Sequence, residues 1–275
     1  IKIPSTVTSL GTCVFANCSS LISVELPSTI NAIGSCVFVG CSSLTSVNLP
    51  STITTLGYRV FDGCSSLTSV NLPSTITTLG DRLFEGCSSL TSVNLPCTIT
   101  SLGYRVFRGC SSLTSVNLPS TIITIDHDVF EGCSSLTSIN LPSTITTIGN
   151  SVFRGCSSLT SVTLPPITTI GHFMFDNCPS LTSVHMPKNP TAISVIAFEG
   201  CSKLTHIKAP SFSTTTFDNN LGLKDILVDA GFSPSNPHDI IRGQPTRQTN
   251  CCARRFQNTD MYYDTKTWAR TNGVD

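Results

Sequence analysis

Charged residues are scarce in this chain of 275 residues, at 12% of the total. A typical globular domain carries about 25%. Sixteen basic residues balance sixteen acidic ones, so the net charge of zero provides no field that would attract a nucleic acid. No apolar run approaches the roughly 18 to 20 residues that span a bilayer. The composition therefore argues against nucleic-acid binding and against a membrane span in this chain.

Motifs for catalysis and metal binding are also missing. The chain has no Gly-x-Ser-x-Gly, no phosphate-cradling glycine loop, no Cys-x-x-Cys and no paired histidines. Asp126-His127-Asp128 falls on repeat positions that elsewhere hold Gly57-Tyr58-Arg59, so we interpret it as a solvated charge group. We predict no catalytic residue, no metal ligand and no cofactor, and therefore a protein that is not an enzyme.

A repeat of 23 residues runs through most of the chain. The unit Leu49–Asn71 and its successor Leu72–Asn94 differ only at Asp81, Leu83 and Glu85. One phenylalanine marks each unit, at Phe15, Phe38, Phe61, Phe84, Phe107, Phe130, Phe153, Phe175 and Phe198, and a cysteine follows each of them by three places. A fixed period of this length predicts a solenoid, in which stacked turns share one continuous core.

The repeated phenylalanines and cysteines are predicted to form a structural ladder inside the solenoid. Its central members are Phe61, Cys64, Phe84, Cys87, Phe107 and Cys110. Cysteine is often buried and packs as a small apolar side chain, so we expect mostly free thiols, which favours a reducing compartment. Cys13 and Cys36 share a second slot, where a bridge is conceivable, but two ligands are too few for a metal site.

Each unit combines two patterns. Leu67–Leu72 alternates apolar and polar residues, which predicts a short strand with Val70 and Leu72 facing inward and Pro73 ending it. The following segment, from Ile76 to Cys87, has apolar spacings of three, four and one, which suit a tight turn or a short helical coil. A glycine such as Gly57 permits the bend between the halves. The predicted fold class is an α/β-type repeat solenoid with a parallel sheet.

The motif Cys-x-x-Leu-x-x-Val/Ile-x-Leu-Pro, followed by Ile-x-x-Ile/Leu-Gly-x-x-x-Phe, closely resembles the BspA-like (Treponema-type) leucine-rich repeats. Residues 1–210 match it almost without interruption. The resemblance implies a right-handed coil with the sheet on its concave face, used for binding other proteins or surfaces, and some relatives are surface adhesins. The last turn departs from the pattern at Met186, Pro190, Ser194 and Ala197, as the start of an end cap would.

Two outward surfaces are candidates for binding. The strand residues that face away from the core form polar columns on the concave face, with Ser69, Asn71, Ser92, Asn94, Ser115 and Asn117 at the centre. The variable charges of each unit form a stripe on the outer side. Because Tyr and Arg are enriched at binding hot spots, the candidate partner-binding residues there are Tyr58, Arg59, Tyr104, Arg105 and Arg108. The alternative for this stripe is solubility supported by ion pairs between turns.

The period stops after Pro210, which divides the chain into a solenoid of about nine repeats (1–210) and a C-terminal region (211–275). Asn220 is a predicted cap for an amphipathic helix over 221–230, which ends at Gly231 and covers the end of the solenoid. A linker follows, and an incomplete further element contains Trp268, the single tryptophan of the chain.

Three functions remain open at this level. The leading one is a non-catalytic protein-interaction scaffold in the cytoplasm, with an unidentified protein partner, which the expected free thiols favour. The alternative is an exported cell-surface adhesin or receptor that binds a host protein, matrix or glycan. A weaker alternative is the recruitment domain of an enzyme truncated here, since the chain opens at Ile1 in the middle of a repeat.

Overall fold

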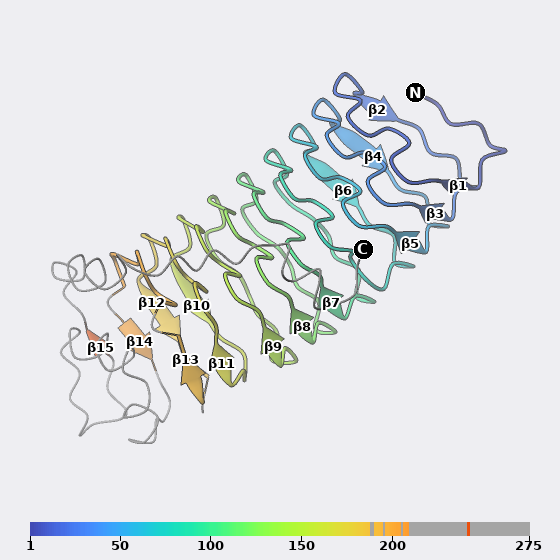
Figure 1. The fold of residues 1–275 in the computed structure, drawn as a ribbon. Coiled ribbons are helices and arrows are strands. Elements are labelled where there is room, and N and C mark those ends of the chain that lie inside the picture. Colours follow the sequence, from blue (N-terminus) through green and yellow to red (C-terminus); the bar gives the residue numbers. More distant parts are fainter. Residues whose placement is uncertain (188–189, 195, 205, 209–240, 243–275) are drawn as a thin grey trace, which may run out of the picture.

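The computed structural model describes residues 1–187, 190–194, 196–204, 206–208 and 241–242. They form an elongated stack of about eight coils with a spacing of about 23 residues (Figure 1). Every strand is two or three residues long, and parallel pairing between neighbouring coils joins the strands into narrow sheets along the stack. No helix long and apolar enough to cross a membrane is found in the part of the chain that the structure describes.

The first row of strands follows the predicted alternation. Strands β2 (Ser23–Val24), β4 (Ser46–Asn48) and β6 (Ser69–Asn71) pair in parallel, with Val24, Val47 and Val70 in register. The row continues through isolated bridges and then through β10 (Ser161–Thr163), β12 (Ser183–His185) and β14 (His206–Lys208). Val70 is buried and Leu72 packs partly buried against the core, so one face of each strand closes the interior.

A second row of strands stands where we expected a turn or helical coil. It consists of β1 (Ser9–Leu10), β3 (Ala32–Ile33), β5 (Thr55–Leu56), β7 (Ser101–Leu102), β8 (Thr124–Ile125), β9 (Thr147–Ile148), β11 (Thr169–Ile170) and β13 (Ala192–Ile193). The described residues contain no helix, so the helical half of the α/β prediction is wrong for them. The hydrogen bonding gives the reason. Gly57 N–H donates to the Ile33 carbonyl of the preceding coil, whereas in a helix it would donate to the carbonyl four residues earlier in the same coil.

The core is a column of stacked rings. The nine repeated phenylalanines, from Phe15 to Phe198, form eight successive stacks with centroids 5.4 to 5.8 Å apart. Beside them, Cys64 Sγ donates to the Phe38 carbonyl oxygen at 3.1 Å, and Cys87 and Cys110 repeat this contact in the next coils. The ladder thus combines stacked rings with thiols that are hydrogen-bonded to backbone carbonyls. Each coil covers the apolar edge of its neighbour.

Gly57 is required by a close approach between coils. A Cβ on Gly57 would lie 2.6 Å from the carbonyl carbon of Gly34 and would overlap the backbone nitrogen of Ser35. The left-handed conformation falls instead on Arg59 and Gly63, with φ of 57° and 73°. Gly57 was expected to permit a backbone bend. In the structure a glycine is needed there because a side chain would collide with the neighbouring coil.

Residues 241–242 lie inside the segment predicted as a linker. Ile241–Arg242 forms β15, which pairs antiparallel with β14 at the C-terminal end of the first row. The predicted helix over 221–230 and Trp268 lie outside the described residues.

Candidate binding surfaces

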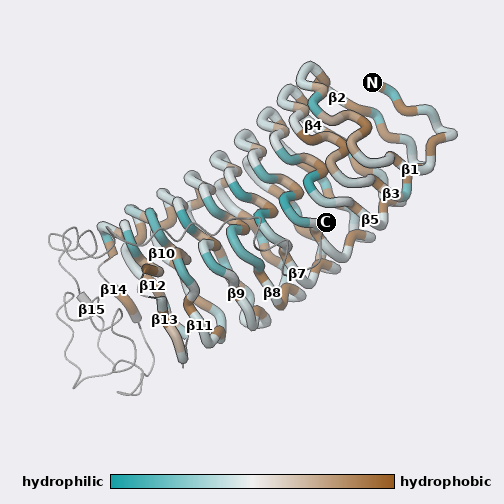
Figure 2. The backbone as a smooth tube through the Cα atoms, viewed as in Figure 1, coloured by the Kyte–Doolittle hydropathy of each residue, from teal (hydrophilic) through white to brown (hydrophobic). Residues whose placement is uncertain are grey.

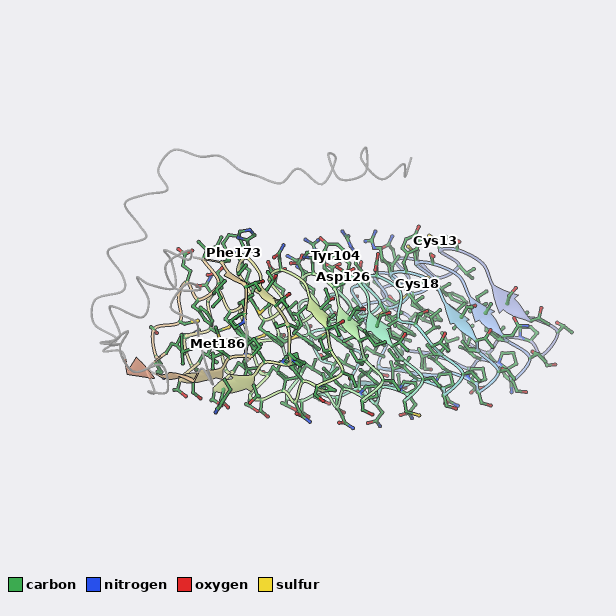
Figure 3. The ribbon with its side chains drawn as sticks, turned by 90° about the horizontal axis from the view of Figure 1, so that it is seen from below. Cys13, Cys18, Tyr104, Asp126, Phe173 and Met186 are labelled. Carbon is green, nitrogen blue, oxygen red and sulfur yellow. The ribbon has the colours of Figure 1, made fainter. Side chains whose placement is uncertain are left out.

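One edge of the stack carries the variable charges. Cys13, Tyr104 and Phe173 lie along this edge (Figure 3). Two repeat positions supply most of these charges: the residue two before the ladder phenylalanine, such as Arg59 or Arg105, and the residue just after it, such as Arg108. The first of these positions has a positive φ in coil after coil, 57° at Arg59 and 58° at Arg105.

The charged residues just after the phenylalanines form a ladder along this edge. Its described members are Asp62, Glu85, Arg108, Glu131, Arg154, Asp176 and Glu199, and the sign of the charge alternates from Glu85 to Asp176. Arg108 binds Glu85 at 2.9 Å and Glu131 at 2.7 Å, and Arg154 binds Glu131 at 3.6 Å and Asp176 at 2.9 Å. Burial lowers the pKa of Arg108, but the hydrogen bonds that Arg108 donates to Glu131 and Glu85 outweigh burial and raise that pKa overall. The expected ion pairs between turns are therefore present.

Tyr104 is the centre of a cluster on this edge. The guanidinium carbon of Arg105 lies 4.6 Å from the Tyr104 ring centroid, and that of Arg82 lies 5.5 Å from it on the neighbouring coil. Burial raises the pKa of Tyr104, with Asp128 and Glu85 adding to the rise and Arg105 and Arg82 opposing it. Tyr104 is thus held in place by two cations.

The five predicted residues divide into two groups. Tyr104, Arg105 and Arg108 lie together, whereas Tyr58 and Arg59 lie two coils away, with Arg82 on the coil between. We define the Tyr–Arg patch as Tyr58, Arg59, Arg82, Tyr104, Arg105 and Arg108. Arg82 was left out of the predicted set, although it occupies the same repeat position as Arg59 and Arg105 and alignment of the units would have identified it.

Each arginine of the Tyr–Arg patch has an acidic partner. Arg59 Nε lies 2.8 Å from Asp62, Arg82 Nε lies 3.6 Å from Glu85, and Arg105 Nε lies 3.0 Å from Asp128 of the next coil. Tyr58 projects from the patch with 54% of its surface exposed. The patch is therefore close to electrically neutral, with rigid guanidinium groups and one projecting aromatic ring.

A second surface lies on the first row of strands. We define the Ser–Asn face as the exposed columns of Ser46, Ser69, Ser92, Ser115 and Ser138 and of Asn48, Asn71, Asn94, Asn117 and Asn140. Asn71, Asn94 and Asn117 stand in parallel register, and hydrophilic segments recur from coil to coil (Figure 2). Within the described coils these side chains make no hydrogen bond to the protein, whereas Thr68 donates to the Thr45 carbonyl. The face presents free amides and hydroxyls at a regular spacing.

The side chains of Asp126, His127 and Asp128 each have a different partner. Asp126 accepts from the His127 backbone N–H at 2.6 Å, and His127 Nδ1 accepts from the Asn150 N–H at 2.8 Å. Asp128 is turned to Arg105. Among the residues that the structure describes, no group of three or more His, Cys, Asp or Glu is placed to hold a metal ion.

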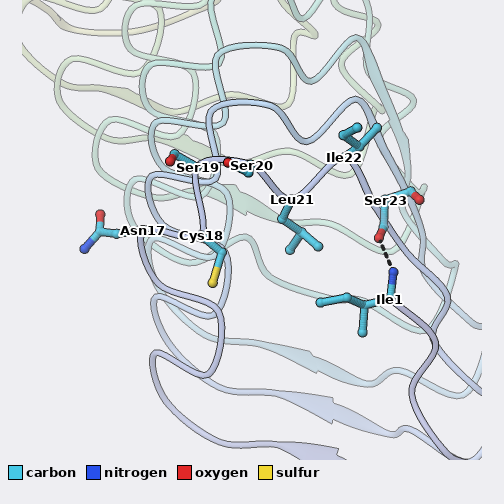
Figure 4. A pocket seen from close by; sticks show the side chains of 8 residues that line it. All are labelled: Ile1, Asn17, Cys18, Ser19, Ser20, Leu21, Ile22 and Ser23. Carbon is cyan, nitrogen blue, oxygen red and sulfur yellow. Dashed lines mark hydrogen bonds between the residues drawn. The ribbon is translucent and has the colours of Figure 1, made fainter.

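A shallow pocket on the first coil of the described stack is lined by Ile1, Asn17, Cys18, Ser19, Ser20, Leu21, Ile22 and Ser23 (Figure 4). The Ile1 nitrogen donates to the Ser23 carbonyl oxygen at 3.0 Å, and Ile1 and Ile22 are 61% and 63% exposed.

Comparison with known protein families identifies the repeat. A family model described as the BspA type leucine rich repeat region matches residues 1–114 and 102–224, in six copies. The chain belongs to this BspA-type leucine-rich repeat family. The resemblance predicted from the Cys-x-x-Leu motif is confirmed. Leucine-rich repeats of this kind are generally non-catalytic, protein-binding scaffolds.

The chain is also similar to proteins with solved structures. The leucine rich repeat protein TpLRR of T. pallidum is 33% identical, covering 58% of this chain and 77% of that chain with a TM-score of 0.55. A leucine-rich repeat protein of Bacteroides ovatus is 26% identical over 76% of this chain and 78% of its own, with a TM-score of 0.43. The pneumococcal vaccine antigen PcpA is 21% identical over 89% and 67%, with a TM-score of 0.59. No curated protein matches the chain.

Proposed function

We propose that this chain is a non-catalytic scaffold that binds a protein partner through the Tyr–Arg patch. The observation that carries the proposal is the contact of the Tyr104 ring with the guanidinium groups of both Arg82 and Arg105. Tyrosine and arginine are enriched at the hot spots of protein interfaces, and side chains already held by such contacts lose less entropy when a partner binds. A Tyr–Arg cluster of this kind therefore suits recognition of a folded protein surface.

The charge balance of the patch supports a protein partner over a polyanion. Arg59, Arg105 and Arg108 each bind a carboxylate, so few positive charges are left for phosphate groups. Tyr58, which is exposed, adds a projecting aromatic ring that a pocket on a partner would accommodate.

The test is a comparison of matched variants of the full chain. Tyr58→Ala and Tyr104→Ala remove the aromatic groups of the patch, and Asn71→Ala with Asn94→Ala changes the same number of residues on the Ser–Asn face. Proteins captured by each immobilised variant are quantified by mass spectrometry. The proposal expects a partner that is lost with the tyrosine variants and retained by the asparagine variant. An identical set of bound proteins for all variants would overturn it.

A second candidate function is supported by the Ser–Asn face. Its amides and hydroxyls have no partner within the described coils, and they carry no charge. A neutral glycan presents hydroxyls that such groups bind through paired donors and acceptors. This face therefore favours the adhesin alternative, in which the ligand is a glycan of a cell surface or matrix.

The glycan candidate has its own measurement. Binding of the full chain to an array of neutral glycans should fall when Asn71 and Asn94 are replaced by aspartate, because the amide donors are lost. Replacement of Tyr58 and Tyr104 should leave glycan binding unchanged. Absence of binding to every neutral glycan on the array would reject this candidate.

A further inference from the structure

Two cysteines outside the ladder occupy the same position of adjacent coils. Cys13 and Cys36 each stand two residues before a ladder phenylalanine, in the column that Arg59 continues. Their φ values are 60° and 57°, so the backbone has the same left-handed conformation at both. Two side chains that leave matching backbones in the same direction meet if the coils are held in register.

Backbone hydrogen bonds hold these coils in that register. Cys13 N–H donates to the Ser35 carbonyl at 2.9 Å, and Phe15 N–H donates to the Val37 carbonyl at 2.9 Å. Parallel segments bonded in this way lie about 4.8 Å apart, and a disulfide requires Cα atoms about 4.4 to 6.8 Å apart. Cys13 also contributes to the raised pKa of Cys36, as expected of neighbouring thiols.

The same column shows this proximity again farther along the stack. Arg105 and Asp128 occupy the equivalent positions of two other adjacent coils, and their side chains meet at 3.0 Å. Cys13 is exposed and Cys36 is 9% exposed, so a small reagent can reach the first thiol. Cys13 lies on the outer edge of the stack (Figure 3).

We propose that Cys13 and Cys36, free thiols in the structure, are a disulfide-forming site that reacts with a low-molecular-weight disulfide such as oxidised glutathione. The Cys13 thiolate attacks one glutathione sulfur and releases the other glutathione. The Cys36 thiolate then attacks Cys13 in the mixed disulfide and releases the second. Two protein thiols are oxidised to one disulfide, one glutathione disulfide is reduced, and the two thiol protons end on the two glutathione molecules.

The bridge would fasten two neighbouring coils to each other. Val14, next to Cys13, is 49% exposed, and Ile1 is 61% exposed. A cross-link limits local opening of coils with such exposed side chains. Burial raises the pKa of Cys36, with Cys13 adding to the rise, so the second, ring-closing step should accelerate as the pH increases.

The test treats the full chain with oxidised glutathione, blocks remaining thiols and maps peptides without reduction. We expect a peptide pair that joins Cys13 to Cys36, and chymotryptic cleavage in the first coil slowed roughly tenfold and restored by reductant. Exposed Cys97, whose equivalents in the adjacent coils are Ser74 and Ser120, should carry glutathione instead. Stable glutathione on Cys13, a bridge from Cys13 to Cys18, or a dimer joined through Cys13 would each overturn the proposal.

A variant tests the column geometry apart from the end of the stack. In a Cys13→Ser background, Arg105→Cys with Asp128→Cys puts two thiols at the equivalent positions of the interior. The proposal expects these thiols to bridge under the same oxidant. A folded double variant that takes up two glutathiones instead would contradict the geometry on which the site depends.

Discussion

The guanidinium of Arg108 binds the carboxylate of Glu131 in the next coil, with Nε and Oε2 2.7 Å apart. Its other side meets Glu85, one coil earlier, at 2.9 Å. Three coils are thereby joined by one side chain on the surface of the stack. Because the coils are otherwise nearly identical in sequence, such contacts distinguish one coil from another.

Replacement of Arg108 should destabilise the stack in a graded way. Arg108→Gln removes two ion pairs, and Arg108→Glu places a third acidic residue between Glu85 and Glu131, in a column that Asp62 already begins. From typical values for such pairs we expect the free energy of unfolding to fall by about 1 kcal/mol in Arg108→Gln and by about 2 kcal/mol in Arg108→Glu. Urea unfolding midpoints at low and high salt measure them, and salt should reduce the difference between the variants. Equal midpoints for Gln and Glu would contradict the ladder.

Stability should fall at alkaline pH because of the buried thiols. Burial raises the pKa of Cys64 from 9.0 to about 12, and burial raises those of Cys87 and Cys110 as well. A raised pKa means that the unfolded chain loses its proton first, so stability is complete below the usual pKa and is lost as the pH rises toward 12. Each thiol contributes a loss of about 1.4 kcal/mol per pH unit in this window.

Unfolding in urea at about pH 8 and about pH 10 measures this loss. Cys64→Ala should reduce the difference in stability between the two pH values, whereas Cys97→Ala, which removes an exposed thiol, should leave it unchanged. If both variants keep the pH dependence of the wild type, other groups cause it.

Gly57→Ala should disrupt the packing of adjacent coils. The new Cβ would meet backbone atoms of Gly34 and Ser35, which cannot move aside as a flexible side chain would. We expect a cost of about 2 kcal/mol, as at other overpacked sites. Gly11→Ala is the matched control, since nothing lies within 4 Å of its Cβ position. Thermal unfolding that affects both variants equally would show that crowding is not the cause.

The position of a phenylalanine in the stack should determine its contribution. Phe107 is fully buried and stacks on Phe84 and Phe130, so Phe107→Ala should cost about 3 to 5 kcal/mol. Phe15 stacks on Phe38 alone and is only partly buried, so Phe15→Ala should cost clearly less. Urea midpoints compare the two, and equal losses would indicate that the end coil is as well supported as the interior.

The sequence predicted the features that depend on the repeat itself. The 23-residue period of Phe61, Phe84 and Phe107 predicted stacked coils, and the alternation around Val70 predicted the first row of strands. Both signals are local or strictly periodic, and packing of one coil on the next preserves them.

The second row of strands was missed for a physical reason. Ile76 and Leu79 are three residues apart, which resembles one face of a helix, but here the spacing reflects a chain that bends around the core. The decisive partner of each N–H lies one coil away, as in the bond from Gly57 to Ile33. No short window of sequence contains both ends of such a bond.

The candidate surfaces were predicted as sets of residues but not as arrangements. Tyr104 and Arg105 could be selected from residue type alone. The contact between Arg82 and the Tyr104 ring depends on the side-chain direction at a left-handed backbone position. The pairing of Arg105 with Asp128 likewise required the register between coils.

The alternation of Glu85, Arg108 and Glu131 has a consequence for how this molecule can change in length. A duplicated unit would meet the same carbonyl and N–H groups as the original, since the bond from Phe61 N–H to Leu83 recurs one coil later between Phe84 and Val106. The interior would thus accept an added coil without adjustment. A copy of the Glu85 unit inserted before Arg108, however, would leave one of the two glutamates without an arginine in the next coil, as Asp62 already is. Insertion of an acidic and a basic unit together would give the new charges partners in adjacent coils, so growth of this gene by paired units should be better tolerated than growth by single ones.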